Sequence, residues 1–193
     1  MKTQQVVIIG GGFAGLEAVR EISRQAPSVE ITLVDANRYA TMVPALPDIV
    51  SGRIPGEALV RPLEQIVPHS VRLAVDQVER VNLEEKRVVA KGGTYRYDYL
   101  VIANGSKPNY FGFRPAGGTL HSVHSYPRAL AFRDAFLRLA QQGEPPEVVV
   151  VGGGYTGLEI AASLRYGVGD NALRPRIRVV ELGESVLPFL PEK

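Results

Sequence analysis

The residues of this chain with the clearest capacity for chemistry are three glycines near its start, Gly10, Gly12 and Gly15. They follow a short apolar run at residues 6–9 and open a helical pattern. Glycine at the first position permits a tight turn, at the second it lets the backbone approach a pyrophosphate, and at the third it lets the helix pack closely on the strand. Free N–H groups and the positive end of the helix dipole then face the phosphates. The spacing therefore predicts a dinucleotide-binding turn.

The same pattern occurs a second time in the chain. Residues 6–17 read VVIIGGGFAGLE and residues 148–159 read VVVVGGGYTGLE, so that the two stretches share eight of twelve residues. One glycine pattern of this kind is weak evidence, whereas its repetition within one chain is strong evidence. We therefore predict two dinucleotides, one at each turn.

An acidic residue follows each turn at the end of a predicted strand. Asp35 ends the stretch EITLVD, 20 residues after Gly15, and Glu181 lies 24 residues after Gly157. A carboxylate at this place accepts hydrogen bonds from a ribose diol, and the alternative for Asp35 is a solvated acid at a strand end. At Glu181 the carboxylate would accept from the 2′-OH of NAD and repel the 2′-phosphate of NADP.

The elements between the two turns predict a parallel sheet with a small antiparallel insertion. Two prolines interrupt residues 39–54, which are too apolar for a free linker. This loop either walls one side of a flat aromatic ring or merely covers the core. The other elements predicted after the second strand are a short helix at 61–67, strands at 71–81 and 87–91 with a hairpin at 92–93, a strand at 99–103 and a helix at 126–142.

Composition excludes several classes of function. The chain has 193 residues, a formal net charge of +2 and no cysteine. The charge offers no argument for nucleic-acid binding, and the lack of cysteine removes disulfides, thiolate metal sites and a redox dithiol. Three histidines, His69, His121 and His124, are too scattered for a metal site. No secretory signal and no membrane-spanning run is evident, so the expected location is the cytoplasm.

The order of glycine turn, acid-ended strand, PALP loop, YDYLVIANG strand and second glycine turn resembles the two-dinucleotide flavoproteins, the FAD-dependent pyridine nucleotide-disulfide oxidoreductases. Within that family the chain is most similar to the amino-terminal half of type II NADH dehydrogenases (NADH:quinone oxidoreductases). The resemblance implies an α/β fold. A Rossmann-like FAD-binding unit with a small antiparallel β insertion would occupy residues 1–110 and lack its last strand. An incomplete Rossmann-like NAD(P)H-binding unit would occupy residues 111–193.

The resemblance also implies the reaction and its site. Hydride would pass from NADH to FAD, and Glu159 would lie at the nicotinamide-flavin junction, unless it is a surface acid in the first helical turn. Asn104 stands where the family usually has Thr. The residues implied in FAD binding are Gly10, Gly12, Phe13, Ala14 and Gly15 at the pyrophosphate, Asp35 at the ribose, Val78 at the adenine, Pro44, Ala45 and Leu46 at the isoalloxazine ring, Ala103, Asn104 and Gly105 beside the cofactor, and Ala36 as a further cofactor contact. Those implied in NADH binding are Gly152, Gly154, Tyr155, Thr156, Gly157 and Glu181.

The family is considerably longer than this chain. The resemblance therefore implies that the last FAD strand, the quinone site and the membrane-contacting helices lie outside it. An uncovered sheet edge would favour association with another chain, and we expect a homo-oligomer. The expected acceptor is a quinone or another small molecule, at the cytoplasmic face of the membrane. Alternatives are a sulfide:quinone reductase, a reductase with an iron-sulfur partner and a nucleotide-binding fragment without activity. A disulfide reductase is excluded because it needs a cysteine pair.

Overall fold

The computed structural model describes residues 3–110, 112, 120–167 and 174–187, and the chain divides into two compact units. The first comprises Met1–Thr41 and Val60–Lys107, and the second comprises Met42–Leu59 and Pro108–Lys193. Residues 42–59 thus belong by their contacts to the second unit. The boundary at residue 110 stays a prediction, and of the residues that follow it, 111 and 113–119 lie outside the described residues.

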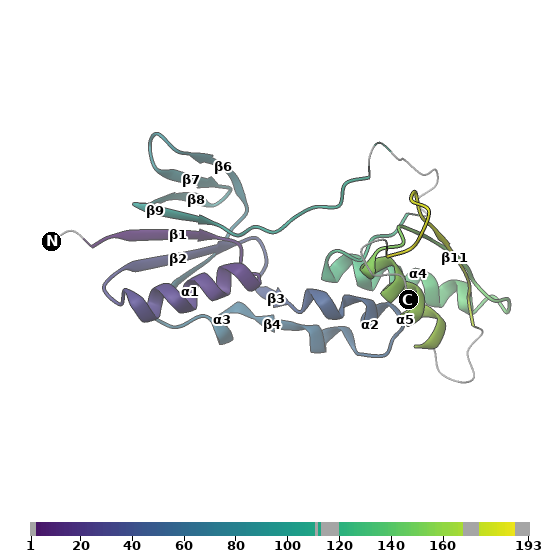
Figure 1. The fold of residues 1–193 in the computed structure, drawn as a ribbon. Helices are drawn as coiled ribbons and strands as arrows, with labels where there is room; N and C mark the ends of the chain where they lie inside the picture. Colours follow the sequence, from purple (N-terminus) through teal and green to yellow (C-terminus); the bar gives the residue numbers. More distant parts are fainter. Residues whose placement is uncertain (1–2, 111, 113–119, 168–173, 188–193) are drawn as a thin grey trace. The chain divides into compact units, whose positions relative to one another are not determined.

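A parallel sheet forms the centre of the first unit (Figure 1). Its strand order is β5-β2-β1-β9, and Ile8 of β1 lies opposite Leu33 of β2. Ile8 and Leu33 are fully buried, as expected for strands that are covered on both faces. The elements of this sheet and the helix after its first strand are β1 (Gln5–Ile9), α1 (Phe13–Gln25), β2 (Glu30–Asp35), β5 (Arg72–Val75) and β9 (Tyr99–Ile102).

Each face of this sheet has its own cover. On one face, Val19 of α1 and Leu63 pack with Ile8 and Leu33. On the other face, Val88 packs with Val7 and Ile9 of β1 and lies in a three-stranded antiparallel sheet, the predicted insertion. The strands of that insertion are β6 (Val78–Asn82), β7 (Arg87–Ala90) and β8 (Gly93–Arg96).

Two of the predicted elements in this unit are wrong in detail. The strand predicted at 71–81 is two strands, because the chain changes partner at Asp76: the N–H of Asp76 donates to Asp35 of β2, and the O of Gln77 accepts from Lys91. The helix predicted at 61–67 starts at Leu63, since Arg61 belongs to a strand. The elements concerned are β3 (Tyr39–Thr41), its antiparallel partner β4 (Val60–Pro62), and α3 (Leu63–Ile66).

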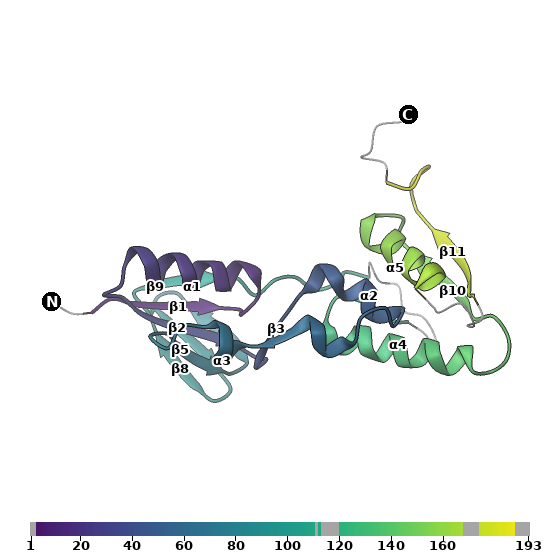
Figure 2. The same ribbon diagram turned by 90° about the horizontal axis from the view of Figure 1, so that it is seen from below.

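Three helices pack side by side in the second unit (Figure 2). Its described strands, β10 and β11, are parallel, and Val150 lies opposite Val179. Phe136, Leu164 and Leu46, one from each helix, are buried together. The elements of this unit are η1 (Val43–Ala45), α2 (Leu46–Val50), η2 (Gly56–Leu59), α4 (Tyr126–Ala140), β10 (Glu147–Val151), α5 (Tyr155–Tyr166) and β11 (Arg176–Val180).

The stretch at 39–54, predicted as a loop, is therefore partly helical. Pro44 and Pro47 are the second residues of η1 and α2. Proline is tolerated there because the first N–H groups of a helix have no intrahelical partner. Burial of Leu46, Ile49 and Val50 then stabilises a helix that local periodicity does not predict.

Candidate functional site

The first glycine turn has the close backbone approaches that its spacing predicts. Gly10 has φ +104°, a conformation that favours glycine, and a Cβ there would lie 2.3 Å from the carbonyl oxygen of Ala103. A Cβ on Gly15 would lie 1.8 Å from the carbonyl oxygen of Gly10. These two positions cannot hold a side chain without movement of the backbone.

Gly12 differs from these two because the space beside it is open. Among the described residues, no atom lies within 4 Å of the place that its Cβ would take. It is the N-cap of α1, and within the described part of the chain no side chain caps this helix end. Phe13 and Ala14, which follow, are exposed. An uncapped N-terminus with open space beside it is suited to an anion.

The second turn repeats this geometry in the second unit. Gly152 has φ +106°, and a Cβ on Gly157 would lie 2.0 Å from the carbonyl oxygen of Gly152. Gly154 is the N-cap of α5, and no described atom lies within 4 Å of its Cβ position. Tyr155 and Thr156 are exposed at the start of α5, as Phe13 and Ala14 are at the start of α1. The two sequence motifs therefore form the same local structure.

Each strand-end acid accepts a hydrogen bond from the middle glycine of its turn. Gly11 N–H donates to Asp35 Oδ2 at 2.6 Å, and Gly153 N–H donates to Glu181 Oε2 at 2.5 Å. The second oxygen of Glu181 accepts from the N–H groups of Leu182 and Gly183. Backbone donors, Gly153 first, hold the pKa of the Glu181 carboxyl below its usual value. The spacing argument missed both middle glycines, although the run of three glycines in each turn contains them.

The lowered pKa of Glu181 predicts a loss of stability in acid. The stabilisation from its carboxylate is complete above the unfolded-state pKa, about 4.3, and is lost as the pH falls through the lower folded-state pKa. As the pH is lowered from about 6 to about 3, we expect the thermal midpoint of Glu181→Gln to fall less than that of the unchanged protein. Glu184→Gln, which removes the same charge from an exposed residue nearby, is the control. Equal slopes for Glu181→Gln and the unchanged protein would contradict the assignment.

The strand predicted to lie beside the cofactor does reach the first turn. Ala103 N–H donates to the carbonyl oxygen of Ile9 at 2.8 Å, which places Ala103 and Asn104 next to Gly10. Gly105 follows with φ +69°, the left-handed region in which glycine is favoured. Ala103, Asn104 and Gly105 therefore lie at the carboxyl end of the sheet, where open α/β folds bind ligands.

Three further predicted residues, Val78, Ala36 and Glu159, lie outside the two glycine turns. Val78 is half-buried at the start of β6 and pairs with Ala90. Ala36 is exposed directly after Asp35. Glu159 is exposed on α5, and it lies beyond the first turn of this helix rather than in it.

The residues predicted at the isoalloxazine ring belong to the second unit. Pro44 is exposed and Ala45 is half-buried, but the side chain of Leu46 is fully buried in the helical core. The exposed apolar side chains of this stretch are instead Met42, 51% exposed, and Val43, 48% exposed. The apolar surface that this stretch offers to a ligand is therefore made by residues 42–45.

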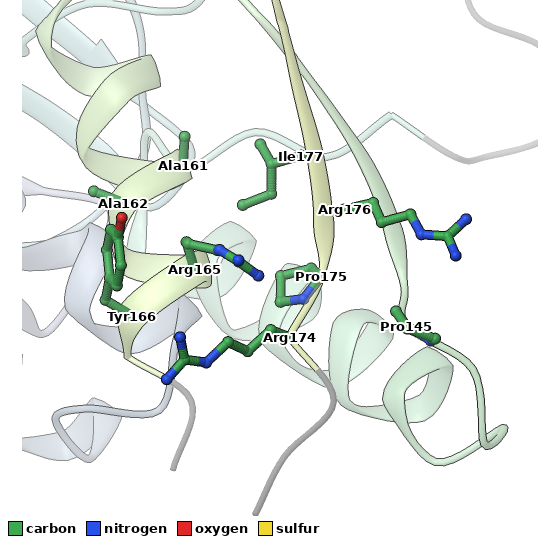
Figure 3. Close-up of a pocket in the computed structure, with 9 residues that line it drawn as sticks. All are labelled: Pro145, Ala161, Ala162, Arg165, Tyr166, Arg174, Pro175, Arg176 and Ile177. Atoms are coloured by element: carbon green, nitrogen blue, oxygen red, sulfur yellow. The ribbon is translucent and has the colours of Figure 1, made fainter. Parts of the chain in front are cut away.

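A hollow of about 600 Å³ lies at the other end of the second unit's strands (Figure 3). Arg165 from α5 and Arg174, two residues before β11, extend across it, whereas Arg176 points away. Ligands of open α/β sheets bind at the carboxyl ends of the strands, and this hollow lies at their amino ends. The hollow is therefore separate from the predicted dinucleotide site.

These geometries define a class of protein. In each unit a glycine turn lies at the carboxyl end of a parallel strand, no side chain among the described residues caps the helix that follows it, and an acid lies at the end of the next strand. This is the arrangement of a dinucleotide-binding protein with two sites. The chain belongs to the pyridine nucleotide-disulphide oxidoreductase family, whose model matches residues 4–193.

Curated relatives cover nearly the whole chain. A type II NADH:quinone oxidoreductase of Staphylococcus haemolyticus is 26% identical over 98% of this chain and 52% of its own length. An NAD(P)H sulfur oxidoreductase (CoA-dependent) of Pyrococcus abyssi is 33% identical over 94% of this chain and 40% of its own length. The chain thus spans about half the length, or less, of these relatives.

Solved structures share the fold. The structure of NDH2 from Plasmodium falciparum in complex with NADH has a TM-score of 0.87 at 22% identity, and it covers 99% of this chain and 44% of its own. The sulfide:quinone oxidoreductase of Aquifex aeolicus has a TM-score of 0.78 at 23% identity, and it covers 93% of this chain and 43% of its own. At these identities the likeness shows the fold alone.

These findings confirm several predictions. The family, the resemblance to type II NADH dehydrogenases over about half of their length, and the α/β fold with an incomplete second unit are confirmed. The matched family is one of oxidoreductases, and the activity and the cofactors FAD and NADH remain proposals, because the chain spans about half the length of its relatives. Among the described residues, no helix has the length and apolar character that crossing a membrane requires.

Proposed function

We propose that the protein oxidises NADH with FAD and passes the electrons to a quinone. The observation that carries this proposal is the repeated turn geometry within one chain, which provides a separate helix N-terminus for each of two dinucleotides. The name of the relative from Staphylococcus haemolyticus supports NADH as the donor and a quinone as the acceptor. When flavin is bound, it supplies the capacity to accept a hydride and to pass electrons on singly.

In the first unit, we assign the turn at Gly10, Gly12 and Gly15 to the pyrophosphate of FAD. Phe13 and Ala14 add backbone N–H groups at the same helix end. Asp35 would bind the adenosine ribose through the acceptor capacity that remains on its carboxylate, since Oδ2 accepts from Gly11 and Oδ1 accepts from the backbone N–H and the side-chain amide of Asn37. The remaining assignments to FAD are Ala36 as a cofactor contact, Val78 at the adenine, Pro44 and Ala45 at the ring, and Ala103, Asn104 and Gly105 beside the cofactor. Leu46 is left out because its side chain is fully buried in the helical core.

In the second unit, we assign the turn at Gly152, Gly154 and Gly157 to NADH. Glu181 would accept from the 2′-OH of its adenosine ribose. The hydrogen bond from Gly153 holds the carboxylate at the turn before any ligand arrives, so that little reorganisation accompanies binding. Tyr155 and Thr156 would line the pyrophosphate, and Glu159 would lie toward the nicotinamide.

The sulfur oxidoreductase of Pyrococcus abyssi favours a second candidate, a reductase acting on a sulfur compound, because its identity to this chain is higher, at 33%. Against this candidate, the 193 residues contain no cysteine to attack or carry sulfur. A quinone acceptor needs no thiol from this chain, so we prefer it.

An absorbance spectrum followed by anaerobic addition of NADH tests the proposal. We expect a flavin spectrum that bleaches on addition of NADH, because both turns are formed. Reoxidation by a soluble quinone analogue, and not by elemental sulfur or polysulfide, would distinguish the two candidates. A colourless protein that takes up no added FAD would contradict the proposal and leave a nucleotide-binding fragment without activity.

Glu181 is expected to select NADH over NADPH. A carboxylate bonded to the ribose repels the 2′-phosphate, so Glu181→Gln should raise the ratio of NADPH to NADH use by about tenfold, or about 1.4 kcal/mol. The measurement is the rate of flavin reduction by each nucleotide, with Glu184→Gln as the charge-matched control. An unchanged ratio would show that Glu181 does not face the ribose.

Association and location remain proposals. Val149, Val151 and Val180 of the two-stranded sheet are 58%, 70% and 52% exposed, and an exposed apolar sheet face of this kind supports our expectation of a homo-oligomer. A peripheral position at the cytoplasmic face of the membrane is proposed from the quinone acceptor. Sedimentation of the purified protein with and without lipid vesicles would test both.

A further inference from the structure

Two buried polar side chains, Ser51 and Ser163, lie between helices of the second unit. Ser163 is 6% exposed on α5, and Ser51 is 7% exposed at the end of α2. Ser163 Oγ lies 2.8 Å from the carbonyl oxygen of Pro47 and 3.0 Å from Ser51 Oγ. Each hydroxyl has one proton, so Ser163 donates to Pro47 or to Ser51 at any one time, and Ser51 Oγ also lies at donating distance, 3.2 Å, from the carbonyl oxygen of Asp48. These bonds join parts of the chain that are more than a hundred residues apart in sequence.

The carbonyl group of Pro47 has a structural reason to need this partner. The helix α2 has five residues, so the carbonyl groups of its last turn lack intrahelical donors. A buried carbonyl without a partner is destabilising, and the hydroxyl of Ser163 satisfies this one.

Gly167 allows the two helices to approach at this point. It is the C-cap of α5, and a Cβ there would lie 2.3 Å from Ser51 Cβ. Its φ of −84° suits any residue, so the close approach alone requires glycine. The ends of α2 and α5 are therefore held together by a glycine contact and two hydrogen bonds.

The hydrogen bonds of Ser163 fix the position of α2 along α5, which the surrounding apolar contacts do not. Leu46, Ile49 and Val50 of α2 pack with Leu164 and Phe136 through contacts that have no direction, and α2 can slide while still burying them. The bonds of Ser163 are satisfied in one register only, because another register leaves buried polar atoms unpaired. They therefore specify where α2 lies along α5.

This register matters because each helix leads into a proposed cofactor contact. The helix α2 is preceded by Pro44 and Ala45, which we propose at the flavin ring, and α5 begins at the turn that we propose for NADH. We propose that Ser163 is a positioning residue that, with Ser51, fixes the flavin-facing loop relative to the NADH-binding turn. The inference rests on the proposed function, since it assigns the bond a role in hydride transfer.

The test compares Ser163→Ala with Ser23→Ala. Ser23 lies on α1, and its buried hydroxyl has no partner within the described structure, so it is a matched control for the loss of a buried hydroxyl. For Ser163→Ala we expect the rate of flavin reduction by NADH to fall about tenfold in single-turnover experiments, because displacement of a positioning element slows transfer. We expect the Kd for NADH to stay within about twofold, because the phosphate-binding turn is untouched. Ser23→Ala should match the unchanged protein.

Ser51→Ala provides a second variant and a double-mutant cycle. We expect it to slow flavin reduction as well, and the double variant to be no slower than Ser163→Ala alone, because both changes break one network. A lower thermal midpoint for Ser163→Ala with an unchanged rate of flavin reduction would overturn the inference and leave a structural role. If the unchanged protein itself is not reduced by NADH, the proposed function fails, and that failure is seen before any variant is made.

Discussion

Replacing Gly12 by aspartate is expected to give a folded protein that no longer binds FAD. The space beside Gly12 is open and its φ of −83° suits any residue. Aspartate is also a favourable N-cap, so α1 should be no less stable. Its negative charge would, however, occupy the helix N-terminus that we propose for the pyrophosphate. Loss of hydrogen bonds to a charged phosphate, each worth roughly 1.5–3 kcal/mol, predicts a Kd for FAD at least about 100 times higher.

Gly154→Asp is the matched variant in the second unit. Gly154 is also an N-cap with an ordinary φ, −77°, and open space. We expect this variant to keep its flavin spectrum but to show no bleaching at NADH concentrations that reduce the unchanged protein. Flavin content, NADH titration and circular dichroism of both variants give the result. Loss of flavin in Gly154→Asp with retention in Gly12→Asp would reverse the assignment of the two turns.

Replacing Gly15 by alanine is expected to damage the fold itself. The added Cβ would lie 1.8 Å from the carbonyl oxygen of Gly10. This oxygen is a backbone atom of the turn, so it cannot move aside as the end of a flexible side chain can. Overpacking in a well-packed core costs typically 1–3 kcal/mol, and contact with backbone atoms places this case at about 3 kcal/mol. Chemical denaturation of the flavin-free protein measures the loss.

Gly12→Ala is the control for this second prediction. It adds the same methyl group three residues earlier, where no described atom lies within 4 Å. Its free energy of unfolding should change by less than about 0.5 kcal/mol. Gly157→Ala should behave as Gly15→Ala does, because its Cβ would lie 2.0 Å from the carbonyl oxygen of Gly152. Equal stability of Gly15→Ala and Gly12→Ala would show that the turn is looser than described.

Local patterns predicted the elements around the two turns well. The strand before Gly10, the helix from Phe13 and the strand ending at Asp35 are present as expected, and so are their counterparts around Gly152. Apolar runs, glycine spacing and a terminal acid are all properties of neighbouring residues. They act within a few residues of one another, so the printed sequence carries them directly.

Elements that depend on distant partners were predicted less well. The strand predicted at 71–81 divides because the chain pairs with β2 only as far as Asp76, and residues from Val78 onward pair with β7. Residues 46–50 are helical because Phe136 and Leu164, far along the chain, bury their apolar side chains. Neither partner can be inferred from periodicity within a short window.

The sequence by itself determined the class of protein: two glycine turns, each followed by an acid, predicted two dinucleotide sites, because glycine and carboxylate act there through backbone geometry and charge. Tertiary structure alone decided three further features. It bonds each acid to the middle glycine of its turn, buries Leu46 away from any ligand, and attaches α2 to α5 through Ser163. All three depend on contacts between residues distant in sequence, which form only when the chain has folded.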